Sequence, residues 1–192
     1  MFAANLAPER SACADILSPR LILRHLDAEV LRLGCNGRHA EAGARLGAAL
    51  PADWLGEQAL MALRLADMLA DSAYAPWSLR AMLCRRSGRM LGHIGFHSMP
   101  GPEYLHPLAP GAVELGYTVF TAHRCQGYAA EALATLLHWA LRSHGQQRFV
   151  LSIAPDNAAS LALARRFGFA QVGRWFDPQD GDELVYLLEH GA

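Results

Sequence analysis

The stretch from 112 to 153 constrains the fold most, because it places one helix pattern between two strand patterns. Residues 112–120 (AVELGYTVF) alternate between two sets of side chains, as a strand with two different faces does. Residues 127–144 carry apolar positions at helical spacing, and residues 148–153 form a short apolar strand. Two strands pair in parallel only where such a crossover joins them. This unit therefore predicts a mixed α/β sheet in which one pair can run parallel.

The rest of the chain supplies strands joined by turns, with further helices between them. The other expected strands are 21–26, 79–84, 90–97, 169–175 and 183–189. Residues 27–71 are helical in pattern, and a last helix follows Asp156 or Asn157. This order predicts a mostly antiparallel central sheet of about seven strands with flanking helices.

One domain accounts for the whole length of 192 residues. We expect a flexible N-terminal arm over 1–18 and a single domain over 19–192. The net charge of −1 gives no basic face for nucleic acid. The N-terminus lacks the pattern of a signal peptide, and no uninterrupted apolar run reaches the length of a membrane span. We therefore expect a cytoplasmic protein without a membrane or nucleic-acid partner.

The four cysteines, at 13, 35, 84 and 125, form no close pair. Neither the spacing of metal ligands nor a dense disulfide framework is present. The sequence therefore predicts reduced thiols and no metal.

The helix expected from Gly127 begins with features of an anion-binding site. Backbone N–H groups at a helix N-terminus are free of helical partners, and the helix dipole adds positive charge there. Gly127 lets a phosphate approach without a Cβ in the way, and Ala129 keeps the next turn bare. Many helices begin with glycine, so an ordinary helix start remains the alternative on this feature alone.

Residues 124–129 (RCQGYA) match the pattern Q/R-x-x-G-x-G/A and resemble the GNAT superfamily of N-acetyltransferases. Residues 111–120 resemble the bulged fourth strand of that family. The segments 155–160 (PDNAAS) and 166–169 (RFGF) resemble its second cofactor helix. The motifs follow in the family's order across 79–189. The E-I/L-G-Y strand and the N-x-x-S helix are similar to the branch of ribosomal-protein N-terminal acetyltransferases (RimJ/RimL-like).

The resemblance implies a GNAT-like fold with a splayed parallel pair, here 112–120 and 148–153, and acetyl-CoA as cosubstrate. The backbone of Val119 would pair with the pantetheine arm. Asn157 would bond the cofactor near its pantetheine amides, with Ser160 beside it. The pyrophosphate would be bound by the motif itself: Arg124, Cys125, Gln126, Gly127, Tyr128 and Ala129.

The chain departs from many relatives at the group that protonates the departing thiolate. Those relatives have a tyrosine seven residues after the asparagine, whereas this chain has Ala164. Either another group or water then protonates the thiolate, or the chain is a poor catalyst. The RimJ/RimL-like branch often lacks this tyrosine too.

Glu114 is the first candidate for the base that deprotonates the acceptor amine. The alternative is a structural carboxylate bonded to backbone or arginine. Tyr117, on the opposite face unless a bulge changes the parity, is a secondary candidate. His93 and His97 share one strand face roughly 13 Å apart, too far to share a metal. Each could act as a base singly or be an ordinary packed histidine.

The acceptor would be met by Trp54 and by the loop 176–182. This loop carries three carboxylates, of Asp177, Asp180 and Asp182, which would attract a cationic amine. The alternatives are core packing for Trp54 and a plain solvated turn for the loop.

These observations predict an acetyl-CoA-dependent N-acetyltransferase acting on a primary amine by direct attack in a ternary complex. The acceptor is a protein or peptide N-terminus or a small-molecule amine. Its identity, the acyl-chain preference and the formation of a homodimer are left open. The alternative from another class is a non-catalytic CoA-binding or sensor domain of the same fold.

Overall fold

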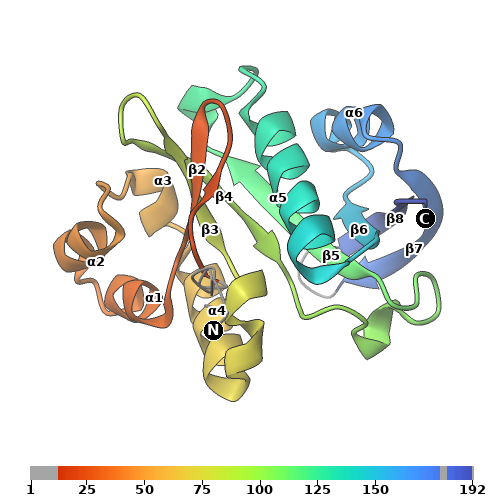
Figure 1. Cartoon of the computed structure of the whole chain (residues 1–192), viewed down its shortest axis with the longest axis horizontal. Helices are drawn as coiled ribbons and strands as arrows, with labels where there is room; N and C mark the ends of the chain where they lie inside the picture. The colour runs from red at the N-terminus through yellow and green to blue at the C-terminus, as the bar shows by residue number, and fades with distance from the viewer. Residues whose placement is uncertain (1–12, 178–180, 192) are drawn as a thin grey trace, which may run out of the picture.

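The computed structural model describes residues 13–177 and 181–191, in which eight strands form one sheet (Figure 1). The order across the sheet is β1-β2-β3-β4-β5-β6-β8-β7, and every neighbouring pair is antiparallel except β5 and β6. The predicted mixed, mostly antiparallel sheet is confirmed. The strands are β1 (Ile16–Leu17), β2 (Leu21–His25), β3 (Arg80–Cys84), β4 (Met90–Phe96), β5 (Val113–Val119), β6 (Arg148–Ile153), β7 (Ala170–Asp177) and β8 (Gly181–Glu189).

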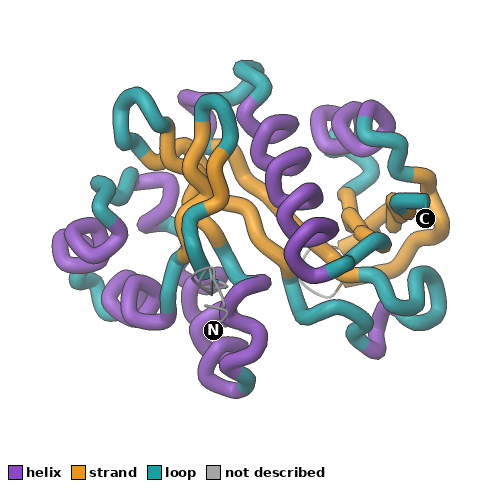
Figure 2. Tube along the Cα trace, viewed as in Figure 1, coloured by secondary structure: helices purple, strands orange, loops and turns teal. Residues whose placement is uncertain are grey.

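Helices cover the sheet in two groups (Figure 2). The predicted helical block divides into four, α1 (Ala28–Cys35), α2 (His39–Leu46), α3 (Ala52–Leu55) and α4 (Gln58–Ala70), followed by the 3-10 turn η1 (Ser72–Trp77). The later helices are α5 (Tyr128–His144) and α6 (Ala158–Arg166), with short 3-10 turns η2 (Glu103–Leu105) and η3 (Thr121–His123). Among the described residues, no helix combines the length and hydropathy that crossing a bilayer requires.

The parallel strands β5 and β6 touch over a very short length. Only Val113↔Phe149 and Glu114↔Val150 are paired, although β5 continues to Val119. Beyond Glu114 the two strands separate, so that the sheet opens between them. The predicted splayed pair is therefore present. Its parallel direction follows from the α5 crossover.

The bulge expected in 111–120 does not lie between Leu115 and Val119, and for 111–114 it stays a prediction. The pairing of β5 with β4 keeps one register from Gly92↔Val119 to Phe96↔Leu115. The parity of the strand is therefore regular, and consecutive side chains alternate between the faces of the sheet.

The two faces of the sheet carry different covers. On one face, α5 packs through Trp139, whose ring lies 6.4 Å from Phe96, and Phe96 stacks on Phe149 at the same distance. On the opposite face, Val150 of β6 packs with Leu105 and other residues of the 98–111 segment in a separate buried cluster. Because Leu115 is paired with Phe96, it faces α5, and its neighbour Glu114 faces the other way.

Part of the expected N-terminal arm belongs to the sheet. Ile16 and Leu17 form β1 and pair with β2. The buried guanidinium of Arg80 donates to the carbonyl of Ala14 at 2.9 Å. These contacts attach residues 13–18 to the domain. Residues 1–12 of the arm lie outside the described residues.

The free energy of unfolding should fall in mild acid, at pH values above those at which most carboxylates bind protons. Burial lowers the pKa of His93 to about 4, and burial together with Arg80 lowers the pKa of His25 to about 4. Since the unfolded state binds protons near pH 6.5, it holds more protons than the native state between about pH 6.5 and 4. The free energy of unfolding therefore falls as the pH falls through this window, by on the order of 3 kcal/mol for His93.

Urea unfolding at pH 7.0, 5.5 and 4.5 measures this loss of stability. A His93→Phe variant keeps a ring of similar size against Trp54 and Phe120, and it should show a shallower dependence. Equal unfolding free energies at pH 7.0 and 4.5 in the unaltered chain would contradict the prediction.

Candidate active site

The N-terminus of α5 is built as an open anion cradle. Gly127 precedes the helix in the left-handed region at φ 77°, and no side chain caps this end. Cys125 also has a positive φ of 58° and is exposed. The first-turn N–H groups lack helical acceptors and face away from the helix body. The motif residues 124–129 therefore leave backbone N–H groups without helical partners, the kind of group that can hold an anion.

Backbone groups of β5 face the opening of the sheet next to this cradle. Phe120 N donates to Leu91, and His97 N donates to the carbonyl of Glu114, so even-numbered residues of this stretch bond to β4. In an antiparallel pair, the residues between them direct their N–H and C=O groups to the other edge. Tyr117 and Val119 therefore present main-chain groups to the opening. The carbonyl of Val119 already accepts a bond from Arg124 Nε at 3.0 Å.

Arg20 is a cradle residue that the sequence reasoning missed. Its Nη1 donates to the carbonyl of Gln126 at 3.0 Å, and its guanidinium lies 4.6 Å from the centre of the Tyr128 ring. Its Nε bonds Glu131 in the first turn of α5 at 2.5 Å. Arg20 thus ties the strand β2 end to the cradle loop. The two segments lie 106 residues apart, so no local spacing could have indicated the contact.

Helix α6 brings Asn157 and Ser160 close to Tyr117 of β5. The Asn157 side chain accepts from Ser160 N at 3.1 Å, so its oxygen caps the helix. Burial raises the pKa of Tyr117, and the neighbouring Ser160 hydroxyl offsets part of this rise. Tyr117 thus lies on the α6 side of the sheet, away from Glu114. Ala164, a residue of α6, is fully buried.

Glu114 stands at the closed end of the opening, on the opposite face, with 5% of its surface exposed. The Tyr104 hydroxyl donates to its Oε2 at 2.9 Å, and His97 Nδ1 lies 3.7 Å from the same oxygen. Burial raises the pKa of Glu114, but the interactions with His97, Ser152 and Tyr104 outweigh it and hold the pKa below its usual range. The carboxyl group is therefore ionised at neutral pH.

Trp54 is a core residue, contrary to its expected acceptor contact. Only 1% of its surface is exposed, and its ring lies 5.3 Å from that of His93. The indole, carried by α3, packs against His93 of β4, so almost none of its surface is left to contact an acceptor.

The loop 176–182, called the acidic hairpin below, joins β7 to β8, and its described strand ends lie on the side of the sheet where Glu114 contacts Tyr104 and His97. Asp177 pairs with Gly181 and Asp182 with Phe176 at the ends of β7 and β8, whereas Asp180 lies outside the described residues. The ring of Trp175, two residues before Asp177 in β7, lies 5.9 Å from the Tyr104 ring. The hairpin thus borders the face of the sheet on which Glu114 lies.

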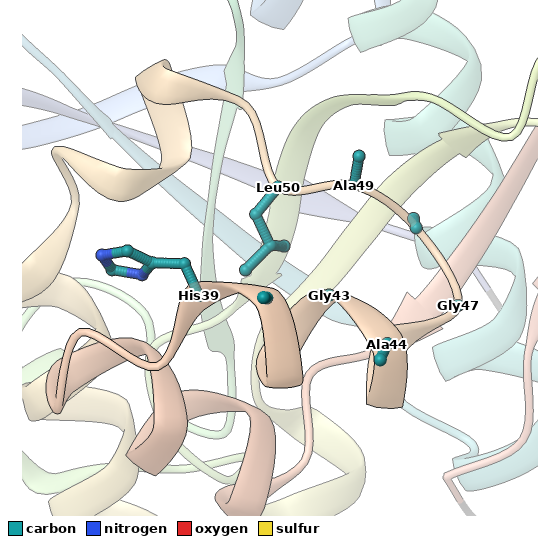
Figure 3. Close-up of a pocket in the computed structure, with 8 residues that line it drawn as sticks. His39, Gly43, Ala44, Gly47, Ala49 and Leu50 are labelled. Carbon is teal, nitrogen blue, oxygen red and sulfur yellow. The ribbon is translucent and has the colours of Figure 1, made fainter.

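A separate hollow of about 650 Å³ lies along α2 and the segment after it (Figure 3). His39, Gly43, Gly47 and Leu50 are among its lining residues. None of the residues expected at the site lines it, so it is not the opening between β5 and β6.

Comparisons with known proteins agree with this geometry. A family model described as an acetyltransferase (GNAT) domain matches residues 20–170. The uncharacterized N-acetyltransferase YoaA of Bacillus subtilis is 28% identical over 109 residues, which are 54% of this chain and 58% of that protein. The chain thus aligns with little more than half the length of this curated relative.

Solved structures align over nearly the whole chain. A Bordetella pertussis protein assigned to the GnaT acetyltransferases is 27% identical, with a TM-score of 0.60 over 91% of this chain and 99% of that one. RimL, a ribosomal L7/L12 α-N-protein acetyltransferase in complex with coenzyme A, is 21% identical, with a TM-score of 0.61 over 92% and 98%. A ribosomal-protein-S5-alanine acetyltransferase from Vibrio fischeri is 13% identical, with a TM-score of 0.60 over 92% and 96%. The last two likenesses show the fold alone.

Proposed function

The chain belongs to the GNAT acetyltransferase family, and on this premise we propose that it moves an acetyl group from acetyl-CoA to a primary amine by direct attack in a ternary complex. The acceptor is a protein or peptide N-terminus or a small-molecule amine, and the reaction takes place in the cytoplasm. The observation that carries the proposal is the uncapped N-terminus of α5 beside the opening between β5 and β6.

The N-terminus of α5 and the edge of β5 bind different parts of acetyl-CoA. The N–H groups of 124–129 hold the pyrophosphate, and Arg20 braces the cradle loop through the carbonyl of Gln126. The pantetheine arm then follows the edge of β5 from Val119, bonding to main-chain groups as an added strand would. Asn157 and Ser160 approach the arm from α6.

The closed end of the opening sets where the thioester stops. Since β5 and β6 pair again at Glu114↔Val150, an arm that enters at Val119 ends near Gly116. The amine then reaches the acyl carbon from the Glu114 face, which the 98–111 segment and the acidic hairpin border. Holding both reactants in place supplies much of the acceleration, and no covalent acyl-enzyme is needed.

A screen of acceptors tests the proposal. The release of free CoA from acetyl-CoA is measured with Ala- and Ser-initiated peptides, spermidine and an aminoglycoside, and products are identified by mass spectrometry. The peptides are included because RimL and the Vibrio fischeri protein are named for ribosomal-protein substrates. Amine-dependent release is expected. Tight acetyl-CoA binding without turnover of any amine would contradict the proposal and favour the sensor alternative, which Ala164 motivates.

The acidic hairpin should attract cationic acceptors. Replacing Asp177 and Asp182 by asparagine removes two negative charges near the acceptor face. We expect the KM for spermidine to rise about fourfold at low salt, since each charge is worth roughly 0.4 kcal/mol at 10 Å in water. The effect should fade at physiological ionic strength, and the KM for acetyl-CoA should not change.

The matched control is Glu29→Gln/Glu41→Gln, which removes the same charge from α1 and α2. An unaltered spermidine KM at low salt in the hairpin variant, or an equal rise in the control, would leave the hairpin as a plain turn.

A further inference from the structure

His97 follows β4 and places its ring over the middle of β5. Its N–H donates to the carbonyl of Glu114 at 2.9 Å, which fixes its backbone in the sheet. A Cβ on Gly116 would lie 2.7 Å from His97 Nε2, so the ring occupies the space that this glycine leaves. Gly116 is also where an acyl arm entering at Val119 would end. The imidazole therefore adjoins the expected position of the thioester.

An acceptor can reach His97 but not Glu114. The His97 side chain is 46% exposed, whereas that of Glu114 is 6% exposed. Glu114 is also bonded by the Tyr104 hydroxyl, and its lowered pKa makes it a weak proton acceptor. Imidazole accepts protons readily in the neutral range, which is why histidine serves so often as a general base.

The other charged groups around His97 bind its backbone or each other. Arg64 of α4 donates to the His97 carbonyl at 2.7 Å and pairs with Asp67 at 3.2 Å. Tyr104 donates to Glu114 and not to the imidazole. The carboxylate of Glu114 lies 3.7 Å from Nδ1 and faces the ring. Catalytic hydrogen bonds are often long before the substrate is bound and tighten in the complex, which suits a contact of this length.

We propose that His97 is the general base of the acetyl transfer, with Glu114 and Tyr104 as its positioning residues. As the amine nitrogen bonds to the acyl carbon, its proton passes to Nε2. The carbon–sulfur bond breaks and its electron pair leaves on sulfur. The proton held by His97 then passes to the CoA thiolate or to solvent. The inference rests on the proposed function, since it assigns a role within that reaction.

The test compares His97→Gln and Glu114→Gln, using the amine from the screen that the unaltered enzyme turns over fastest. His97→Gln should lower kcat by about 100- to 10,000-fold and leave the KM for acetyl-CoA within twofold. The fall of kcat on the acidic side of the pH profile, which reports protonation of the base, should disappear. A His97→Ala variant should regain part of its rate with added imidazole, which a purely structural role would not explain.

Glu114→Gln and Tyr104→Phe should have smaller effects on kcat, about tenfold. Glu114→Gln should leave the KM for acetyl-CoA within twofold, because the carboxylate positions the imidazole and does not touch the cofactor. The matched control is His138→Gln, an exposed histidine on α5 that faces neither reactant. Circular dichroism confirms folding of each variant.

A His97→Gln enzyme that keeps its kcat and its acidic limb, while Glu114→Gln loses both, would overturn the proposal and make Glu114 the base. An unaltered enzyme that binds acetyl-CoA in calorimetry but acetylates no amine would overturn the proposed function and this inference with it. The two failures are thus distinguished by the behaviour of the unaltered enzyme.

Discussion

Gly127→Glu should reduce acetyl-CoA affinity by at least about 100-fold and leave the fold intact. The new carboxylate would stand at the cradle where the phosphates bind, and like charges about 5 Å apart repel by roughly 3 kcal/mol near a protein surface. The left-handed backbone at φ 77° adds strain for any side chain. The position is exposed, so the core is untouched. Isothermal calorimetry measures the affinity.

Gly145→Glu is a matched control for this variant. Gly145 ends the same helix in the same left-handed region, at φ 66°, and a Cβ there meets open space. The added charge and the added strain are therefore alike, at the opposite end of α5. Equal affinity losses in the two variants, or unchanged affinity in Gly127→Glu, would refute the cradle.

Gly92→Ala should destabilise the protein by about 3 kcal/mol, at the upper end of the usual cost of overpacking. A Cβ at Gly92 would lie 2.1 Å from the carbonyl oxygen of Thr118 and 3.0 Å from the Cα of Val119. Both atoms belong to the backbone of β5 and cannot rotate away. Relief requires β5 to move from β4, which shifts the edge proposed to bind pantetheine.

We expect the midpoint of thermal unfolding of Gly92→Ala to fall by roughly 6–12 °C, given the usual 2–4 °C per kcal/mol for a chain of this size. Acetyl-CoA binding should weaken as well. Gly191→Ala, where a Cβ meets open space, should leave both unchanged. A Gly92→Ala protein as stable as the parent would contradict the prediction, because β5 could then move away from β4 without a loss of stability.

The sequence predicted the sheet because its signals were local. Alternation over 112–120, a helical stripe and a second apolar strand are each visible within about twenty residues, and the crossover rule converts them into a parallel pair. The bulge was taken from the resemblance alone, and from Leu115 to Val119 the strand keeps a regular register with β4.

The site was only partly predictable, because several of its contacts join distant segments. The cradle at Gly127 follows from a short motif. Arg20 lies 106 residues before Gln126 in the sequence, so no short motif could have indicated that the two are in contact. The burial of Trp54 depends on how α3 lies on β4, and the pairing of His97 with Glu114 depends on the strand register. Contacts of this kind depend on how distant segments pack in the folded chain, and local sequence patterns do not determine them.

The two halves of the sheet, β1–β5 and β6–β8, are joined by a very short stretch of strand pairing between β5 and β6. In the part of the chain that the structure describes, these two halves pair as strands only at Val113↔Phe149 and Glu114↔Val150. Resistance to a twist between the halves therefore comes mainly from side chains, such as Phe96 stacked on Phe149 beneath α5. Glu114 belongs to this short junction, so a change in the angle between the halves would also change its distances to His97 and Tyr104.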